Sequence, residues 1–112
     1  MKKVEAIIKP FKIDEVREAL VAAGVSGMTV TDVRGCGSQP EKTHCYEEAE
    51  YTIDLLPRTK VEVVVADDRA ETVVAVICKA AWTGSVGDGK VFVLPILEAL
   101  RIRTGEMGGA AL

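Results

Sequence analysis

Hydrophobic and polar positions alternate in two short segments of similar composition, residues 4–8 (VEAII) and 61–65 (VEVVV). Both segments are rich in β-branched residues, which favour the pleated geometry of a strand. Two later segments, 28–35 (MTVTDVRG) and 90–95 (KVFVLP), have a similar character. The sequence therefore predicts four strands, which form two pairs along the chain.

A helical period of apolar residues separates the two strands of each pair. The first helix is expected to begin near Asp14, to present Val16 and Leu20 on one face, and to stop at Gly24. The second is expected to follow Asp67 and Asp68 and to stop at Gly84. Its apolar stripe consists of Val73, Val76, Ile77 and Ala80. The order of elements is therefore βαβ followed by βαβ.

Connections of this length join parallel strands, and such crossovers are almost always right-handed. Two crossovers in one sheet, with both helices on the same face, predict an α+β fold, the ferredoxin-like βαββαβ sandwich. We expect residues 1–112 to form one domain. The open face of the sheet should expose apolar side chains, among them alternate residues of VEAII and VEVVV. A closed homo-oligomer would cover such a patch.

The connection between the second and third strands is much longer than the others. From Gly35 to about Arg58 the chain shows little regular pattern, and loops beyond about 15 residues are usually functional or mobile. We predict a long mobile loop there. It contains the segment HCYEEAEY (44–51), which is rich in reactive side chains. After Pro95 we expect one short helical turn, a strand at 101–103 and a Gly/Ala-rich tail.

Composition restricts the class of protein. Hydrophobic residues make up 48% and charged residues 28%, as in ordinary globular domains, and no apolar run is long enough to cross a bilayer. The charged, alternating start does not resemble a signal peptide. Three cysteines without CxxC spacing favour reduced thiols and a cytoplasmic location. A net charge of −3 argues against nucleic acid as a partner.

The strongest local chemical signal is TGSVGDGKVFV (83–93). Its glycines, Gly84, Gly87 and Gly89, allow backbone N–H groups to turn toward an anion, and Lys90 adds a positive charge. The segment is not a Walker motif, because no Ser or Thr follows the lysine. A phosphate-binding loop and a plain glycine-rich turn both explain these residues. Arg101 and Arg103 would share one face of an extended segment, either as a phosphate clamp or as a solvated edge.

Over its full length the chain resembles the PII nitrogen-regulatory signal-transduction proteins. Five segments carry the resemblance, in order and at the family's spacing: KKVEAIIKPFKIDEV (2–16), GMTVTDVRGCG (27–37), AEYTIDLLPRTKVEVVVADD (49–68), TGSVGDGKVFVLP (83–95) and RIRTGE (101–106). The resemblance implies a homotrimer of ferredoxin-like subunits. It also implies ATP or ADP as the ligand in clefts between neighbouring subunits, with Mg²⁺ accompanying ATP and no prosthetic group.

The resemblance also implies which residues bind the nucleotide. One subunit would contribute Gly35, Gly37, Glu62, Val64, Gly87, Asp88, Gly89 and Lys90. The other wall would consist of Ile7, Gly27, Met28, Thr29, Arg101 and Arg103 from the neighbour. Ser38 and Gln39 complete the expected set. The nucleotide-binding loop would span 82–90, and the C-terminal segment 101–112.

The family's effector loop would correspond to residues 37–55, which would dock on a membrane transporter or a metabolic enzyme. In the family, Mg-ATP recruits 2-oxoglutarate, and here Gln39 and Arg58 would hold it. Tyr51 matches a tyrosine that some members have uridylylated.

Several residues depart from the family pattern. Glu47 stands where a lysine or arginine usually plugs the mouth of an ammonium channel, so its charge disfavours that partner. Ser38 replaces a basic residue, Trp82 takes a usually basic position, and Glu41 adds a negative charge near an anionic ligand. Arg58 replaces a lysine, which keeps the charge but changes the geometry. These changes affect 2-oxoglutarate sensing and channel docking more than nucleotide binding.

Cys36, His44 and Cys45 are candidate ligands for a transition metal, but their spacing matches no zinc pattern, and we assign no metal site. We expect a non-enzymatic regulator that controls nitrogen-metabolism enzymes or transporters through its mobile loop. An ATP-hydrolysing enzyme is disfavoured, because no nucleophile–base pair lies near the glycine loop and the only histidine, His44, lies in the long loop. The alternative is a divergent PII-like regulator that senses bicarbonate, a metal or redox state together with adenine nucleotides.

Overall fold

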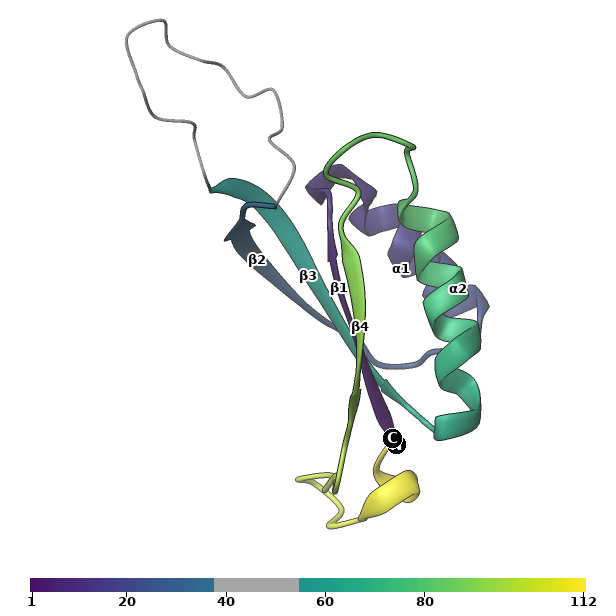
Figure 1. Ribbon diagram of the computed structural model, residues 1–112. Coiled ribbons are helices and arrows are strands. Elements are labelled where there is room, and N and C mark those ends of the chain that lie inside the picture. The colour runs from purple at the N-terminus through teal and green to yellow at the C-terminus, as the bar shows by residue number, and fades with distance from the viewer. Residues whose placement is uncertain (38–54) are drawn as a thin grey trace, which may run out of the picture.

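The computed structural model describes residues 1–37 and 55–112. The elements, in chain order, are β1 (Lys2–Ile8), η1 (Pro10–Lys12), α1 (Ile13–Ala22), β2 (Thr29–Gly35), β3 (Leu56–Val65), η2 (Asp67–Arg69), α2 (Ala70–Ala81), β4 (Lys90–Pro95) and η3 (Gly108–Ala111). The α+β ferredoxin-like arrangement predicted from the sequence is confirmed. Both helices cover the same face of the sheet, and the two ends of the chain lie close together (Figure 1).

The strands follow the order β2-β3-β1-β4, and every pair of neighbours is antiparallel. The two strands that a helix connects run in the same direction but are not adjacent. Strand β3 lies between β1 and β2, and β1 lies between β3 and β4. Strands β2 and β4 are therefore the two edges of the sheet.

The hydrophobic core lies between the sheet and the two helices. Alternate residues of β1 and β3 point toward the helices and are buried, as the period of two predicts. They pack against the buried stripes of α1 and α2. The core consists of Val4, Ala6, Ile8, Val16, Leu20, Val61, Val63, Val65, Val73, Ile77 and Ala81. Each fully buried Val, Leu or Ile of this set contributes roughly 1.5–3 kcal/mol by its removal from water.

The open face of the sheet differs from the expectation of an apolar surface. It presents a ladder of ion pairs across β1 and β3: Lys3 Nζ lies 3.9 Å from Glu5 Oε2, and Lys60 Nζ lies 3.7 Å from Glu5 Oε1 and 3.2 Å from Glu62 Oε1. The expectation holds only in part, because most apolar residues of VEAII and VEVVV face the helices. Ile7, Val64, Phe92 and Leu94 remain on the open face beside these charges, as the strand register shows.

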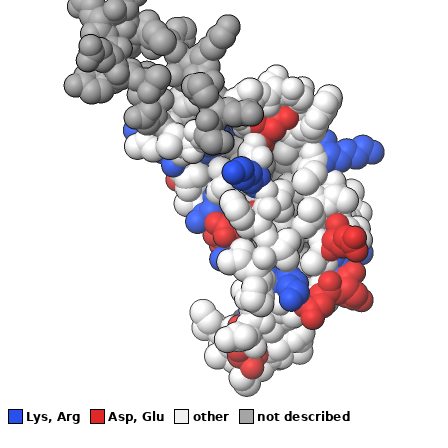
Figure 2. Space-filling view, viewed as in Figure 1, with Lys and Arg blue, Asp and Glu red and all other residues white. Residues whose placement is uncertain are grey.

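Lys, Arg, Asp and Glu side chains are interleaved on the described surface that Figure 2 shows. That surface carries no large patch of a single charge sign.

Helix α1 ends in a Schellman motif at the predicted glycine. The N–H of Gly24, whose φ is 85°, donates to Val21 O, and the N–H of Val25 donates to Leu20 O, both at 3.0 Å. Val25 then packs against the core. The guanidinium of Arg69 donates to the carbonyl of Ala23, which ties η2 to the end of this helix.

Three local expectations were wrong in whole or in part. Helix α2 ends at Ala81 rather than at Gly84, because Trp82 is already extended, with φ −68° and ψ 130°. Residues 101–103 form no strand: an isolated bridge joins Leu100 to Met107, and the chain turns between them, with the N–H of Arg101 donating to Glu106 O at 2.8 Å. The one short helical turn expected after Pro95 is present as η3, but it follows residues 101–103 instead of preceding them.

Within residues 1–37 and 55–112, no helix combines the length and the apolar character that crossing a membrane requires.

The core can be tested with two adjacent leucine and valine positions of α1. Leu20 is fully buried, whereas the side chain of Val21 is 64% exposed. We expect Leu20→Ala to lower the free energy of unfolding by about 2–5 kcal/mol, because the neighbouring side chains cannot fill the cavity. Val21→Ala should change it by only about 0.5 kcal/mol. Urea denaturation of both variants measures this, and equal losses would contradict the placement of the core.

Candidate functional site

The carboxylate of Asp88 organises the glycine-rich loop between α2 and β4. It accepts hydrogen bonds from the backbone N–H of Thr83 at 2.8 Å and of Gly84 at 2.9 Å, and from the hydroxyl of Thr83. Lys9 Nζ lies 3.4 Å from Asp88 Oδ1 and donates to Thr83 Oγ1 at 3.2 Å. The side chain of Asp88 thus fixes the loop to Lys9, which directly follows β1.

These contacts change the ionisation of Asp88. Partial burial acts to raise its pKa, but the hydrogen bonds from Thr83, Gly84 and Lys9 outweigh that effect and lower the pKa from 3.8 to about 2. Asp88 is therefore an anion at neutral pH. It is a poor proton acceptor and belongs to the loop's structure rather than to acid–base chemistry.

Glycine at position 89 is required by its contact with β1. Gly89 has a φ of 103°, and a Cβ atom there would lie 1.6 Å from the carbonyl oxygen of Ile7. Gly87 also has a positive φ, of 94°. The loop therefore lies directly against the backbone of the central strand, which only glycine allows.

The loop still offers groups for an anion, although fewer than the sequence suggested. Asp88 already accepts from the N–H groups of Thr83 and Gly84. The N–H groups of Gly87 and Gly89 donate to no acceptor in the described part of the chain. Lys90 is exposed and has no ion-pair partner among the described residues. A phosphate at this loop would therefore contact Gly87, Gly89 and Lys90 rather than Gly84.

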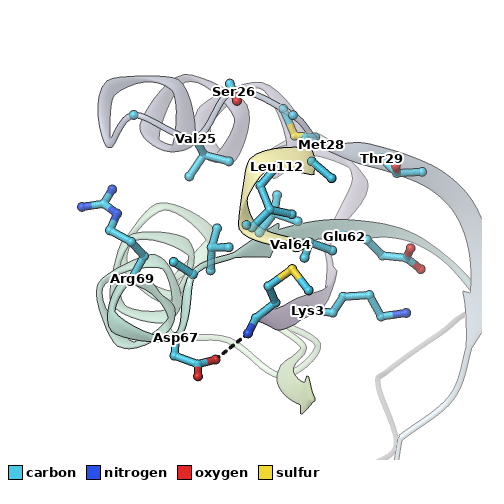
Figure 3. Close-up of a pocket in the computed structure, with 18 residues that line it drawn as sticks. Lys3, Val25, Ser26, Met28, Thr29, Glu62, Val64, Asp67, Arg69 and Leu112 are labelled. Atoms are coloured by element: carbon cyan, nitrogen blue, oxygen red, sulfur yellow. Dashed lines mark ion pairs between the residues drawn. The ribbon is translucent and has the colours of Figure 1, made fainter. Parts of the chain in front are cut away.

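A second candidate region is a cleft of about 690 Å³ at the far end of β3. The expected residues Gly27, Met28, Thr29, Glu62 and Val64 all line it (Figure 3). Strand β2 pairs with β3 only as far as the Thr29–Glu62 pair, so the next three residues of β3 have no strand neighbour on that side. Alternate backbone groups there face the cleft, where they can bind a planar polar ligand.

The cleft has apolar walls and a charged rim. Met28 and Val64 contribute apolar surface, and Glu62 and Lys3 stand at its edge (Figure 3). On another side, the amino group of Met1 lies 2.9 Å from Asp67 Oδ1. The hydrogen bond and charge of that amino group lower the pKa of Asp67.

The two arginines of the C-terminal segment do not share one face of a strand, because residues 101–103 are not extended. Arg101 Nη1 lies 3.2 Å from Glu106 Oε1, and Nη2 donates to the carbonyl of Leu112 at 3.2 Å. Arg103 is exposed within the turn, and its side chain makes no hydrogen bond or ion pair with other described residues. Leu112 in turn lines the cleft, so Arg101 belongs to the cleft group.

The structure separates the expected nucleotide-binding residues into two groups. Ile7 pairs with Lys90 and contacts Gly89, so it belongs with the glycine loop. Glu62 pairs with Thr29, and Val64 lines the cleft, so both belong with Gly27 and Met28. The family resemblance had assigned Glu62 and Val64 to the wall with the glycine loop and Ile7 to the opposite wall. Within this chain the three residues lie the other way round. Gly35 ends β2 opposite Leu56, and Gly37 follows it, exposed.

Several expected residues lie outside the described part of the chain: Ser38, Gln39, Glu41, His44, Cys45, Glu47 and Tyr51. Arg58 lies in β3 opposite Val33, with Nη1 donating to Pro57 O at 2.9 Å. Cys36 is a free, exposed thiol. Across residues 1–37 and 55–112, no cluster of three or more metal-ligating side chains occurs.

Lys9 is the functional-site residue that the sequence did not reveal. It lies 74 positions from Thr83 along the chain, so no local pattern connects the two. The Thr83–Asp88 contact is local, and an acidic side chain just after glycines in a turn was a usable signal for it.

The role of Asp88 predicts a pH-dependent loss of stability. Its pKa is lower in the folded protein, so the carboxylate stabilises the fold above its ordinary pKa, and this stabilisation is lost as the pH falls from about 3.8 toward about 2. We expect Asp88→Asn to cost about 1–2 kcal/mol near neutral pH and progressively less below about pH 4. Asp68→Asn, at an exposed carboxylate, is the control, and urea denaturation across this range is the measurement. A pH-independent difference would refute the assignment.

The close approach at Gly89 can be separated from its positive φ. Gly105 has a φ of 73° with nothing within 4 Å of an added Cβ, whereas Gly89 combines a positive φ with the contact to Ile7 O. We expect Gly105→Ala to cost about 1 kcal/mol of unfolding free energy. Gly89→Ala should cost about 3 kcal/mol or more, because the loop must leave β1. Similar losses in thermal unfolding would show that the contact is unimportant.

Comparison with known proteins agrees with this architecture. The sequence profile described as "Nitrogen regulatory protein P-II" matches residues 1–106. Proteins named nitrogen regulatory protein P-II are 55% identical in Cereibacter sphaeroides and 54% identical in Klebsiella oxytoca and in Azospirillum brasilense. Each alignment spans 112 residues, which is 100% of this chain and 100% of the relative. These names describe regulators rather than enzymes. The chain belongs to the nitrogen regulatory protein P-II family.

Proposed function

We propose that this protein is a regulator that binds ATP or ADP between neighbouring subunits and controls nitrogen-metabolism enzymes or transporters. The observation that carries the proposal is the division of the expected ligand residues into two incomplete groups. One group, around Gly87, Gly89 and Lys90, offers N–H groups and a positive charge. The other, around Met28 and Val64, offers an apolar cleft with exposed backbone groups.

The two groups lie at opposite edges of one sheet. Thr29 belongs to the β2 edge and Lys90 to the β4 edge, with β3 and β1 between them. Three strand spacings separate these edges by about 14 Å. The ion-pair ladder of Glu5, Lys60 and Glu62 occupies the surface between them. A second copy placed alongside would bring the β4 edge of one subunit to the β2 edge of the next and complete the site.

The chemistry of each half suits a different part of a nucleotide. A purine base is flat and apolar with a hydrogen-bonding edge, which suits the cleft beside Met28, Val64 and the unpaired end of β3. Phosphate groups require N–H donors and cations, which Gly87, Gly89 and Lys90 provide. Arg101 and Arg103 would add charge from the cleft side, and Mg²⁺ would accompany ATP at its phosphate oxygens.

Exposed apolar residues support self-association. Leu97 is 95% exposed and Ile102 is 98% exposed, and Phe92, Val93, Leu100 and Met107 are also exposed large apolar residues. Such a density of apolar surface on a small domain indicates an interface. A head-to-tail contact between unlike edges forms a closed ring when its rotation closes. We propose the homotrimer of the family as that ring.

The remaining parts of the proposal follow from family membership. The protein would act in the cytoplasm, and residues 37–55 would dock on a transporter or metabolic enzyme. Tyr51 would be the position of modification. Mg-ATP would recruit 2-oxoglutarate through Gln39 and Arg58, with the reduced affinity that the Ser38 and Glu41 substitutions imply.

Titration calorimetry with ATP and ADP tests the proposal. We expect both nucleotides to bind, and we expect Lys90→Ala to weaken ATP binding by about tenfold or more, because it removes a charge-assisted contact to phosphate. Lys79→Ala, at an exposed lysine near the end of α2, is the matched control and should leave the affinity unchanged. Addition of 2-oxoglutarate to the Mg-ATP complex tests whether the protein also binds 2-oxoglutarate.

Light scattering on the same sample measures the number of subunits. A monomer, or a protein that binds neither nucleotide, would rule out the proposed function. Equal effects of the Lys90 and Lys79 substitutions would rule out the assignment of the glycine loop.

A further inference from the structure

The last residue of the chain lies in the cleft that its own β3 strand forms. Leu112 follows η3, and its side chain extends between the Met28 side of the cleft and Val64 (Figure 3). Gly109 and Ala111 of the same turn line the cleft beside it. Leu112 is 38% exposed and lines the cleft together with Met28 and Val64. It therefore shares the apolar walls on which the base of a ligand would pack.

A set of polar contacts holds the segment in this position. Arg101 Nη2 donates to Leu112 O, and Nη1 pairs with Glu106, both at 3.2 Å. At the other side of the turn, the N–H of Gly108 donates to Glu98 Oε1 at 3.0 Å and to Ala99 O at 2.9 Å. Arg101 is thus the side chain that connects the occupant of the cleft to the turn before it.

We propose that Leu112 is an autoinhibitory occupant of the cleft and that Arg101 is the latch that holds it there. This proposal rests on the proposed nucleotide function. A ligand with a flat apolar ring would compete with the Leu112 side chain for the walls near Met28 and Val64. An anionic group on the ligand would compete with Glu106 and with Leu112 O for the guanidinium of Arg101.

The two competitions favour ligands that carry both groups. A ring without phosphate displaces Leu112 but leaves the Arg101–Glu106 pair intact. Inorganic phosphate reaches Arg101 but gains nothing from the apolar walls. A nucleotide that engages both breaks the contacts of Arg101 and empties the cleft together. Because the latched state must be vacated first, it lowers the apparent affinity in proportion to its population.

The contacts of the latch are weak enough to be displaced. The side chains of Arg101 and Glu106 are 39% and 44% exposed, and ion pairs with such exposure add little stability. We therefore expect the latch to reduce apparent affinity by a factor of about 3–10.

Three variants of the full chain separate the roles of the side chain and the latch. Leu112→Ala removes the occupant and should tighten the binding of adenosine and of ATP alike, by about 3–10-fold. Leu112→Met keeps an apolar side chain of similar volume and should bind both ligands as the unmodified protein does. Glu106→Gln removes the ion pair of Arg101 but leaves its contact with Leu112 O, and it should tighten ATP binding more than adenosine binding. Calorimetry gives these affinities, and thermal unfolding confirms that each variant is folded.

Methyl NMR gives a test that does not depend on measuring a binding affinity. Nuclear Overhauser contacts between the Leu112 and Val64 methyl groups should be present in the ligand-free protein and should disappear at saturating ATP. Their absence without ligand, their persistence with ATP bound, or weaker nucleotide binding by Leu112→Ala would each overturn the proposal. If no variant binds ATP but the Leu112–Val64 contacts are present, the proposed nucleotide function is wrong. The position of Leu112 beside Val64 is then still supported.

Discussion

The structure depends on the way in which β1 and β3 divide their side chains between the two faces of the sheet. Val4, Ala6 and Ile8 of β1 and Val61, Val63 and Val65 of β3 are buried under the helices, and this burial is the main source of stability. The opposite face carries the ion-pair ladder around Glu5 and Lys60. Because both faces in the middle of the sheet are occupied in this way, the candidate ligand-binding groups lie at its edges.

The two edges acquire their chemistry by different means. At the β4 edge, the Asp88 contacts and the absence of a side chain at Gly89 hold the loop against β1. Among the described residues, the N–H groups of Gly87 and Gly89 have no acceptor. At the β2 edge, β2 starts too late to cover the end of β3, and a cleft results. One edge is polar and cationic, the other apolar. The two edges are therefore chemically complementary, as the proposed assembly from identical copies would require.

The C-terminal segment connects the cleft with the exposed turn that contains Glu106. Leu112 lines the cleft, and its carbonyl accepts a hydrogen bond from the same arginine that pairs with Glu106. Occupancy of the cleft and the position of the exposed turn are therefore coupled through Arg101. If a ligand displaces Leu112, as proposed, this coupling would change the exposed turn as well as the cleft.

The sequence alone determined the order of the elements, the buried faces of β1, β3 and the helices, and the glycine loop before Lys90, because these follow from local periodicity and turn chemistry. Family resemblance identified most of the candidate ligand residues. Only the tertiary structure decided that Ile7 lies with Lys90 and Glu62 with Thr29, since strand register is a non-local property. It also decided the contact of Lys9 with Asp88 and the position of Leu112 in the cleft. Both arise from segments distant in the chain, which no local pattern can bring together.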